Sequence, residues 1–266
     1  MPSDQKIWRY IPPNAVTAAS IVFGVVAVQT AVAGRPVSAA WWGLLVTLTD
    51  KLDGLLASLL KAQSSFGVQL DSLADMVAFG VVPSVVYWTL YSTRPELGWT
   101  EGWHREGLRV ICCAYTVSVA LRLARFNVMA QKGPLKHYTG TPSTMTAGTL
   151  MAFLLAMLKY ASPEHIAPEH LDNWRLLGGL STEVVIPFLP WTLLLGAAGM
   201  LSGLRVPKLG RTFNPVVTAV LLLAVGFGYS VGIMRHLPEY LAGGGIYYLG
   251  VCVAYHLRTR GQAPQG

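Results

Sequence analysis

The chain has 266 residues, of which 53% are hydrophobic and only 12% are charged. Soluble proteins carry about twice that share of charged residues, so the composition excludes a soluble fold, and the abundance of apolar residues excludes a disordered chain. A formal net charge of +7 does not require a nucleic-acid partner, because membrane proteins gather Lys and Arg in their cytoplasmic loops. We therefore expect a polytopic protein of the lipid bilayer that binds no nucleic acid.

Apolar stretches with few or no charged residues mark the helices expected to cross the bilayer, each of which needs about 20 residues. In chain order they are Tyr10–Gly34, a stretch from Pro36 onward, Met76–Thr93, Leu108–Asn127, Tyr138–Leu158, Val184–Leu204, Thr212–Met234 and Tyr240–Tyr255. The sequence thus predicts an all-α transmembrane bundle of about eight spans. We expect one domain over residues 1–266, with its core at about 10–210 and the last two spans at 212–257.

Basic residues are distributed unequally between the two sides of this predicted bundle. With the N-terminus placed inside, twelve of the 20 Lys and Arg residues fall on the inner side and seven on the outer side. The positive-inside rule then predicts cytoplasmic N- and C-termini for a multi-pass protein of the cell (inner) membrane.

Four of the 13 acidic residues lie in or beside apolar helices, where an ionised group is costly and indicates function. Asp50 and Asp53 are three residues apart and share one helix face, and Asp71 and Asp75 are four apart and share a face of the next helix. A helical hairpin with its turn at Lys61–Gly67 would bring the two pairs together at the inner ends of the second and third spans.

A group of four carboxylates cannot stay ionised near a low-dielectric medium without cations. Oxygen ligands favour Mg²⁺, Mn²⁺ or Ca²⁺, and four carboxylates can hold two ions of the kind that clamp phosphoryl oxygens. Two other interpretations stay open at this point. The acids can pair with Lys51 and Lys61, or they can line the cation or proton pathway of a transporter.

The acidic segment resembles the signature of the CDP-alcohol phosphotransferase family, D-x2-D-G-x2-A-R-x8-G-x3-D-x3-D. Every spacing recurs, and seven of the eight fixed positions are kept, at Asp50, Asp53, Gly54, Ala57, Gly67, Asp71 and Asp75. The departure is Ser58, which stands where the family has arginine.

Further segments resemble the phosphatidylserine synthase branch of this family, namely Pro13–Thr17, Ser64–Ser84, Leu121–Val128, Thr139–Gly148 and Met200–Lys208. In particular, TGTPSTMTAG at Thr139–Gly148 is similar to the run G-L-P-S-P-A-A-A-G of that branch. The resemblance implies transfer of the phosphatidyl group from CDP-diacylglycerol to L-serine, giving phosphatidylserine and CMP. It also implies a divalent cation, Mg²⁺ or Mn²⁺, and a homodimer. Because the acids lie at the inner ends of the second and third spans, we expect the active site to face the cytoplasm.

The resemblance also implies roles for individual residues. Asp50, Asp53 and Asp71 would bind metal, and Asp75 would both bind metal and act as the general base. Seven positions are implied to contact the CDP-lipid or to compensate for the arginine that this chain lacks at position 58. They are Asn14, Thr17, Gly54, Ser58, Lys61, Ser64 and Gly67. Arg122 and Arg125 are candidates to bind the serine carboxylate or a phosphate, with ordinary positive-inside anchoring as the alternative.

Ser58 leaves several alternatives open, because arginine offers five donors to a diphosphate and serine offers one. Either the affinity for the CDP-lipid is lower, or Lys51 or Lys61 supplies the positive charge in place of the arginine. A third alternative is that the chain is an inactive or re-purposed paralogue. The acidic motif is also compatible with another acceptor, such as glycerol phosphate or an inositol compound. From other classes, a cation transporter and a non-catalytic membrane scaffold remain alternatives.

Overall fold

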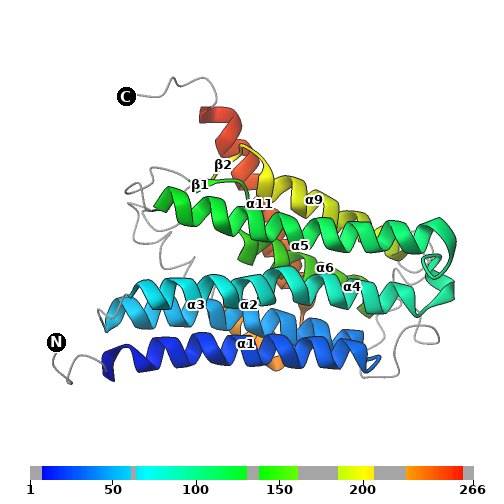
Figure 1. The fold of residues 1–266 in the computed structure, drawn as a ribbon. Coiled ribbons are helices and arrows are strands. Elements are labelled where there is room, and N and C mark those ends of the chain that lie inside the picture. The colour runs from blue at the N-terminus through cyan, green and yellow to red at the C-terminus, as the bar shows by residue number, and fades with distance from the viewer. Residues whose placement is uncertain (1–7, 61–63, 131–137, 161–184, 207–225, 260–266) are drawn as a thin grey trace.

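The computed structural model describes residues 8–60, 64–130, 138–160, 185–206 and 226–259, which form a bundle of long helices (Figure 1). Helix α1 spans Ile11–Val32 and packs along α2, which spans Pro36–Leu59. Gly34 has a positive φ of 77° in the short reversal between them. Glycine adopts this left-handed conformation without the steric cost of a side chain, which permits a turn this tight.

One continuous helical span covers Ser65–Ser92, in which α3 (Ser65–Asp75) and α4 (Val82–Ser92) are joined by a π-helical segment, η2 (Met76–Val81). The widened turns of η2 end at Val81, two residues before Pro83, which lacks the N–H needed to continue an α-helical hydrogen-bond ladder. π-helical segments are rare in proteins, and those that occur are often found at functional sites. Here η2 begins at the residue after Asp75.

Helix α5, Gly102–Ala130, follows a 3-10 turn, η3, at Pro95–Leu97. It packs against α4 and against α9, which spans Pro190–Leu201 and follows a second 3-10 turn, η6, at Ile186–Phe188. Hydrogen bonds made by side chains stabilise the contact between α4 and α5. Ser84 donates to the carbonyl oxygen of Cys112 at 3.0 Å and lies 2.7 Å from the hydroxyl of Thr116, the kind of interhelical bonding that holds membrane helices together.

Helix α6, Ser143–Tyr160, lies against α2 on one side and α11, Pro238–Thr259, on the other. A helix at 226–234 precedes α11. A short antiparallel pair joins β1, Tyr138–Thr139, to β2, Arg205–Val206, with Tyr138 opposite Val206. The span expected from Tyr138 therefore begins as a helix only at Ser143, after this strand pair and Pro142.

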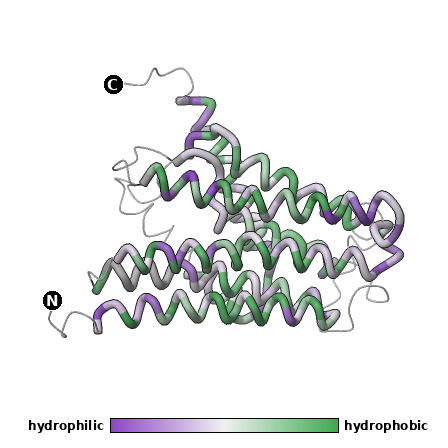
Figure 2. Tube along the Cα trace, viewed as in Figure 1, coloured by the Kyte–Doolittle hydropathy of each residue, from purple (hydrophilic) through white to green (hydrophobic). Residues whose placement is uncertain are grey.

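Among the described residues, three helices are long and apolar enough to cross a membrane: Ile11–Val32, Ser65–Ser92 and Gly102–Met129. Figure 2 shows apolar residues along most of each long helix, with hydrophilic positions toward the two ends of the bundle. These features confirm an all-α membrane protein. The seventh predicted span, Thr212–Met234, lies largely outside the described residues, and its described part, 226–234, is helical.

Candidate active site

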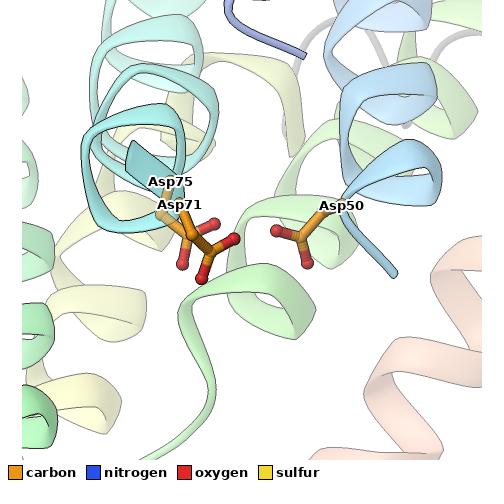
Figure 3. A group of neighbouring side chains, drawn as sticks. All are labelled: Asp50, Asp71 and Asp75. Atoms are coloured by element: carbon orange, nitrogen blue, oxygen red, sulfur yellow. The ribbon is translucent and has the colours of Figure 1, made fainter. Parts of the chain in front are cut away.

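Three carboxylates from two helices converge inside the bundle. Asp50 belongs to α2, whereas Asp71 and Asp75 lie one turn apart on α3, and all three are half-buried. One carboxylate oxygen of each lies within 4.8 Å of the corresponding oxygens of the other two. Figure 3 shows Asp50 pointing across toward Asp71 and Asp75. The predicted hairpin therefore brings these three acids together.

The donor set of this cluster fits a divalent cation. Three carboxylates so close together repel one another unless positive charge or protons lie among them, and oxygen-only ligands suit Mg²⁺ and Mn²⁺. The side chain of Asp53, the fourth predicted ligand, lies outside the described residues. The predictions for Gly54, Ser58 and Lys61 likewise fall on positions whose surroundings are not described.

The first turn of α3 meets the first turn of α1 beside this cluster. Ser64 is the N-cap of α3, and its hydroxyl oxygen accepts a 2.9 Å hydrogen bond from the main-chain N–H of Gly67. A β-carbon placed on Gly67 would lie 3.2 Å from the side-chain oxygen of Asn14. Three of the predicted CDP-lipid residues, Asn14, Ser64 and Gly67, are thus neighbours in space.

Where α1 meets α3, the structure corrects the expected place of Gly67 and shows the hydrogen bond of Thr17. Gly67 was expected in the turn between helices, but it lies in the first turn of α3, because the Ser64 cap starts the helix at Ser65. Thr17 follows Asn14 one turn later on α1, where it is buried and donates to the carbonyl oxygen of Pro13 at 3.1 Å.

Arg122 of α5 lies between the acidic cluster and the start of α6. Its Nε donates to the carbonyl oxygen of Thr141 at 2.7 Å, and its Nη1 donates to the hydroxyl of Ser143 at 3.0 Å. The guanidinium is also within electrostatic range of Asp75. The structure therefore brings Arg122 to the site, where it also holds the loop before α6.

Arg125, one turn further along α5, donates to main-chain carbonyls. Its Nη2 bonds the carbonyl oxygens of Thr139 at 3.0 Å and Met200 at 2.9 Å, and its Nη1 bonds that of Leu201 at 3.3 Å. Met200 and Leu201 end α9, where the last carbonyls have no partner within the helix. Arg125 therefore caps α9 and fastens β1 to it.

Sequence reasoning missed three polar neighbours of the site. The hydroxyl of Thr144 donates to Oδ2 of Asp50 at 3.4 Å. Tyr229, in the helix at 226–234, interacts electrostatically with Asp50, and Tyr248 of α11 does so with Arg122. The two tyrosines belong to the last two predicted spans, where the sequence shows little resemblance to the family. The only sequence feature that distinguishes Thr144 is that it differs from the residue at its place in the run G-L-P-S-P-A-A-A-G.

Several named proteins are similar to this chain. The CDP-diacylglycerol–serine O-phosphatidyltransferase of Mycobacterium leprae (strain TN) is 35% identical over 158 residues, which are 57% of this chain and 49% of that protein. The protein of the same name from Helicobacter pylori (strain J99) is 32% identical over 199 residues, 75% of this chain and 73% of that protein. The archaetidylserine synthase of Methanothermobacter thermautotrophicus is 30% identical over 158 residues, 58% of this chain and 63% of that protein.

This chain spans about half the length of the M. leprae protein that it matches, since the aligned part is 49% of that protein. The sequence profile of CDP-alcohol phosphatidyltransferases matches residues 10–185 of the chain, a stretch that contains the acidic cluster, both arginines of α5 and the start of α6. On this match, which extends over more than half of its length, the chain belongs to the CDP-alcohol phosphatidyltransferase family.

Proposed function

We propose that the protein transfers the phosphatidyl group of CDP-diacylglycerol to the hydroxyl of L-serine, giving phosphatidylserine and CMP. The observation that carries the proposal is the convergence of Asp50, Asp71 and Asp75 within 4.8 Å, in a chain of this family. Serine as the acceptor is supported by the names of the similar proteins from M. leprae and H. pylori.

The acidic cluster is the proposed cation site. Asp50, Asp53, Asp71 and Asp75 would hold one or two Mg²⁺ or Mn²⁺ ions. When bound, such ions supply positive charge that neutralises the diphosphate and stabilises the leaving CMP. The half-buried position of the described acids supports this role, because a buried carboxylate cluster is unfavourable without a cation.

Asp75 is the proposed general base. A serine hydroxyl is a weak nucleophile near neutral pH and needs a positioned base in the transition state. Asp75 accepts the hydroxyl proton while the serine oxygen bonds to the β-phosphorus, and the bond from that phosphorus to the oxygen of CMP breaks. Its place in the cluster, beside the other proposed metal ligands, supports this role.

The proposed CDP-lipid contacts come from α1, from the end of α2 and from the start of α3. They comprise Asn14 and Thr17 from α1, Gly54 and Ser58 from α2, Lys61, and Ser64 and Gly67. The close approach of Asn14 to Gly67, where the main chain carries no side chain, supports the placement of a bulky anionic group there. Lys61 is proposed to supply part of the positive charge that an arginine at position 58 would bring.

The proposed acceptor site involves the two arginines of α5. Arg122 is the better placed of the two to receive the serine carboxylate or a phosphate, because it is within electrostatic range of Asp75. Arg125 shares the same end of α5, but its described hydrogen bonds go to main-chain carbonyls. Arg122 is therefore assigned to the acceptor, with Arg125 as a secondary candidate.

The proposed arrangement in the cell membrane is a single domain over residues 1–266, with its core at about 10–210, about eight spans and a homodimeric assembly. Both termini and the active site would face the cytoplasm. The contact of Asn14 with Gly67 and that of Arg205 with Thr259 support this orientation, since they put the start of α1 and the end of α11 near the acidic end of the bundle. Arg122, Arg125 and Arg205 lie at the same end, as expected for a cytoplasmic face.

The test is release of CMP by the purified full chain in detergent, with CDP-diacylglycerol, Mn²⁺ or Mg²⁺, and a panel of acceptor alcohols. We expect serine-dependent CMP release, phosphatidylserine as the lipid product, and loss of both on chelation of the cation. If glycerol 3-phosphate or inositol reacts and serine does not, the acceptor is that other alcohol and the proposal of serine is wrong. Absence of CMP release with every alcohol, together with cation flux in vesicles, would favour the transporter.

A further inference from the structure

The first turn of α6 reaches the acidic cluster through one hydroxyl. Thr144 is 8% exposed, and its Oγ1 donates to Oδ2 of Asp50 at 3.4 Å. The two residues are 94 positions apart in the chain and belong to different helices. Asp50 faces Asp71 and Asp75 across the cluster (Figure 3), so a contact on Asp50 acts on the orientation of a carboxylate within the site.

The segment that carries Thr144 is anchored from two other helices. Arg122 of α5 bonds the carbonyl oxygen of Thr141 and the hydroxyl of Ser143. From the side of α9, the main-chain N–H of Thr141 donates to the carbonyl oxygen of Gly199 at 3.0 Å, and that of Gly140 donates to Leu204 at 2.8 Å. These bonds fix the residues directly before Thr144 and therefore fix the position of its hydroxyl relative to α2.

Thr144 differs from the two threonines beside it. The hydroxyls of Thr141 and Thr146 lie 3.1 Å apart, and Thr146 also donates to the carbonyl oxygen of Pro142 at 3.0 Å. Those two hydroxyls are satisfied within the segment, whereas Thr144 bonds across to Asp50. All three threonines stand where the run G-L-P-S-P-A-A-A-G has leucine, proline or alanine, and a proline or alanine side chain at position 144 would have no donor.

We propose that Thr144 is a positioning residue for Asp50, whose hydroxyl holds the Asp50 carboxylate turned toward Asp71 and Asp75 and so increases the affinity of the cluster for a divalent cation. The proposal rests on the proposed use of Asp50 as a metal ligand. Hydrogen bonds to metal-binding side chains commonly change metal affinity by about 10- to 100-fold. The bond here is long, and the lower end of that range is expected.

The experiment measures Mn²⁺ binding to the purified full chain without substrates, from the electron paramagnetic resonance signal of free Mn²⁺. Thr144→Val keeps the shape of the side chain and removes the donor, whereas Thr144→Ser keeps the donor. Thr89→Val is the matched control, because Thr89 lies on α4 and its hydroxyl donates within that helix, to the carbonyl oxygen of Val85 at 2.8 Å. We expect about tenfold weaker binding in Thr144→Val, near wild-type binding in Thr144→Ser, and no change in the control.

A second readout separates positioning from substrate binding. In serine-dependent CMP release, Thr144→Val is expected to raise the Mn²⁺ concentration for half-maximal rate about tenfold, while kcat at saturating Mn²⁺ and the KM for serine stay near wild type. Should Thr144→Val not fold, Thr144→Ala removes the same hydroxyl and carries the same expectations.

The outcomes distinguish this inference from the proposed function. Wild-type Mn²⁺ affinity in Thr144→Val, or equal weakening in Thr89→Val, overturns the positioning role and leaves the transfer reaction standing. A wild-type chain that binds Mn²⁺ with the expected response to Thr144→Val, yet releases no CMP, supports the positioning role and overturns the transfer reaction. A wild-type chain that binds no Mn²⁺ overturns both.

Discussion

Asn14 of α1 and Gly67 of α3 approach so closely that a β-carbon on Gly67 would lie 3.2 Å from the side-chain oxygen of Asn14. The same β-carbon would lie 3.1 Å from the hydroxyl oxygen of Ser64, which caps the helix. Both distances are shorter than ordinary van der Waals contact. The bare main chain of α3 therefore faces α1 at the corner proposed to hold the CDP-lipid.

Gly67→Ala is expected to raise the KM for CDP-diacylglycerol by about 3- to 10-fold, which corresponds to about 1 kcal/mol of binding free energy. The thermal unfolding midpoint should change little, because alanine favours a helix over glycine by up to about 1 kcal/mol and offsets the crowding at Asn14. Gly250→Ala in α11, where a β-carbon meets nothing within 4 Å, is the control. An unchanged KM in Gly67→Ala would remove Gly67 from the lipid site.

Asp75→Asn keeps the size of the side chain and removes the proposed base. We expect CMP release to fall by about 10²- to 10⁴-fold, the usual contribution of a positioned base, with the unfolding midpoint of the wild type retained. Glu106→Gln is the control, since Glu106 is exposed and pairs with Arg109 at the other end of α5. A rate in Asp75→Asn close to that of the control would remove Asp75 as the general base, whereas no CMP release by any variant or by the wild type would support the scaffold interpretation.

Arg125→Lys tests whether the second arginine of α5 is structural. A lysine ammonium cannot reproduce the forked bonds to Thr139, Met200 and Leu201. We expect a loss of about 2 kcal/mol in the free energy of unfolding and little change in the KM for serine. Arg109→Lys, which alters an exposed ion pair, should leave stability unchanged. Wild-type stability with a raised KM for serine would instead give Arg125 an acceptor role.

The acids of the site could be predicted from the sequence because their signal is local. Asp71 and Asp75 share a face through their spacing of four, and the intervening polar segment indicated the hairpin that brings Asp50 beside them. The bonds from Thr144 to Asp50 and from Arg125 to Leu201 could not be predicted, because they join distant segments through tertiary packing. The start of α6 was misplaced for the same reason, since β1 exists only through its pairing with β2.

Ser58→Arg restores the residue that the family signature has at this position. An arginine fork offers a diphosphate more donors than one hydroxyl, so we expect a lower KM for CDP-diacylglycerol and an unchanged KM for serine. Ser58→Gln, a long neutral side chain, controls for size. Equal effects of the two substitutions would mean that charge at position 58 does not contact the diphosphate, and that another cation such as Lys61 has this role.

Gly245 of α11 faces Thr149 of α6 at a point where only glycine fits. A β-carbon on Gly245 would collide with the hydroxyl oxygen of Thr149 and would lie 2.8 Å from its β-carbon. The neighbouring Gly244 is exposed, and a β-carbon there meets nothing within 4 Å. The two adjacent glycines therefore form a matched pair for testing how closely α11 must pack on α6.

Gly245→Ala should lower the free energy of unfolding by about 1–3 kcal/mol, the usual cost of overpacking, whereas Gly244→Ala should raise it by about 0.5–1 kcal/mol through helix propensity. Thermal unfolding in detergent measures both. Because α11 also carries Tyr248, which interacts with Arg122, displacement of α11 should in addition raise the KM for serine in Gly245→Ala alone. Equal stability of the two variants would contradict the close packing of α11 on α6, and a KM unchanged by a destabilising Gly245→Ala would show that α11 supports the fold without shaping the acceptor site.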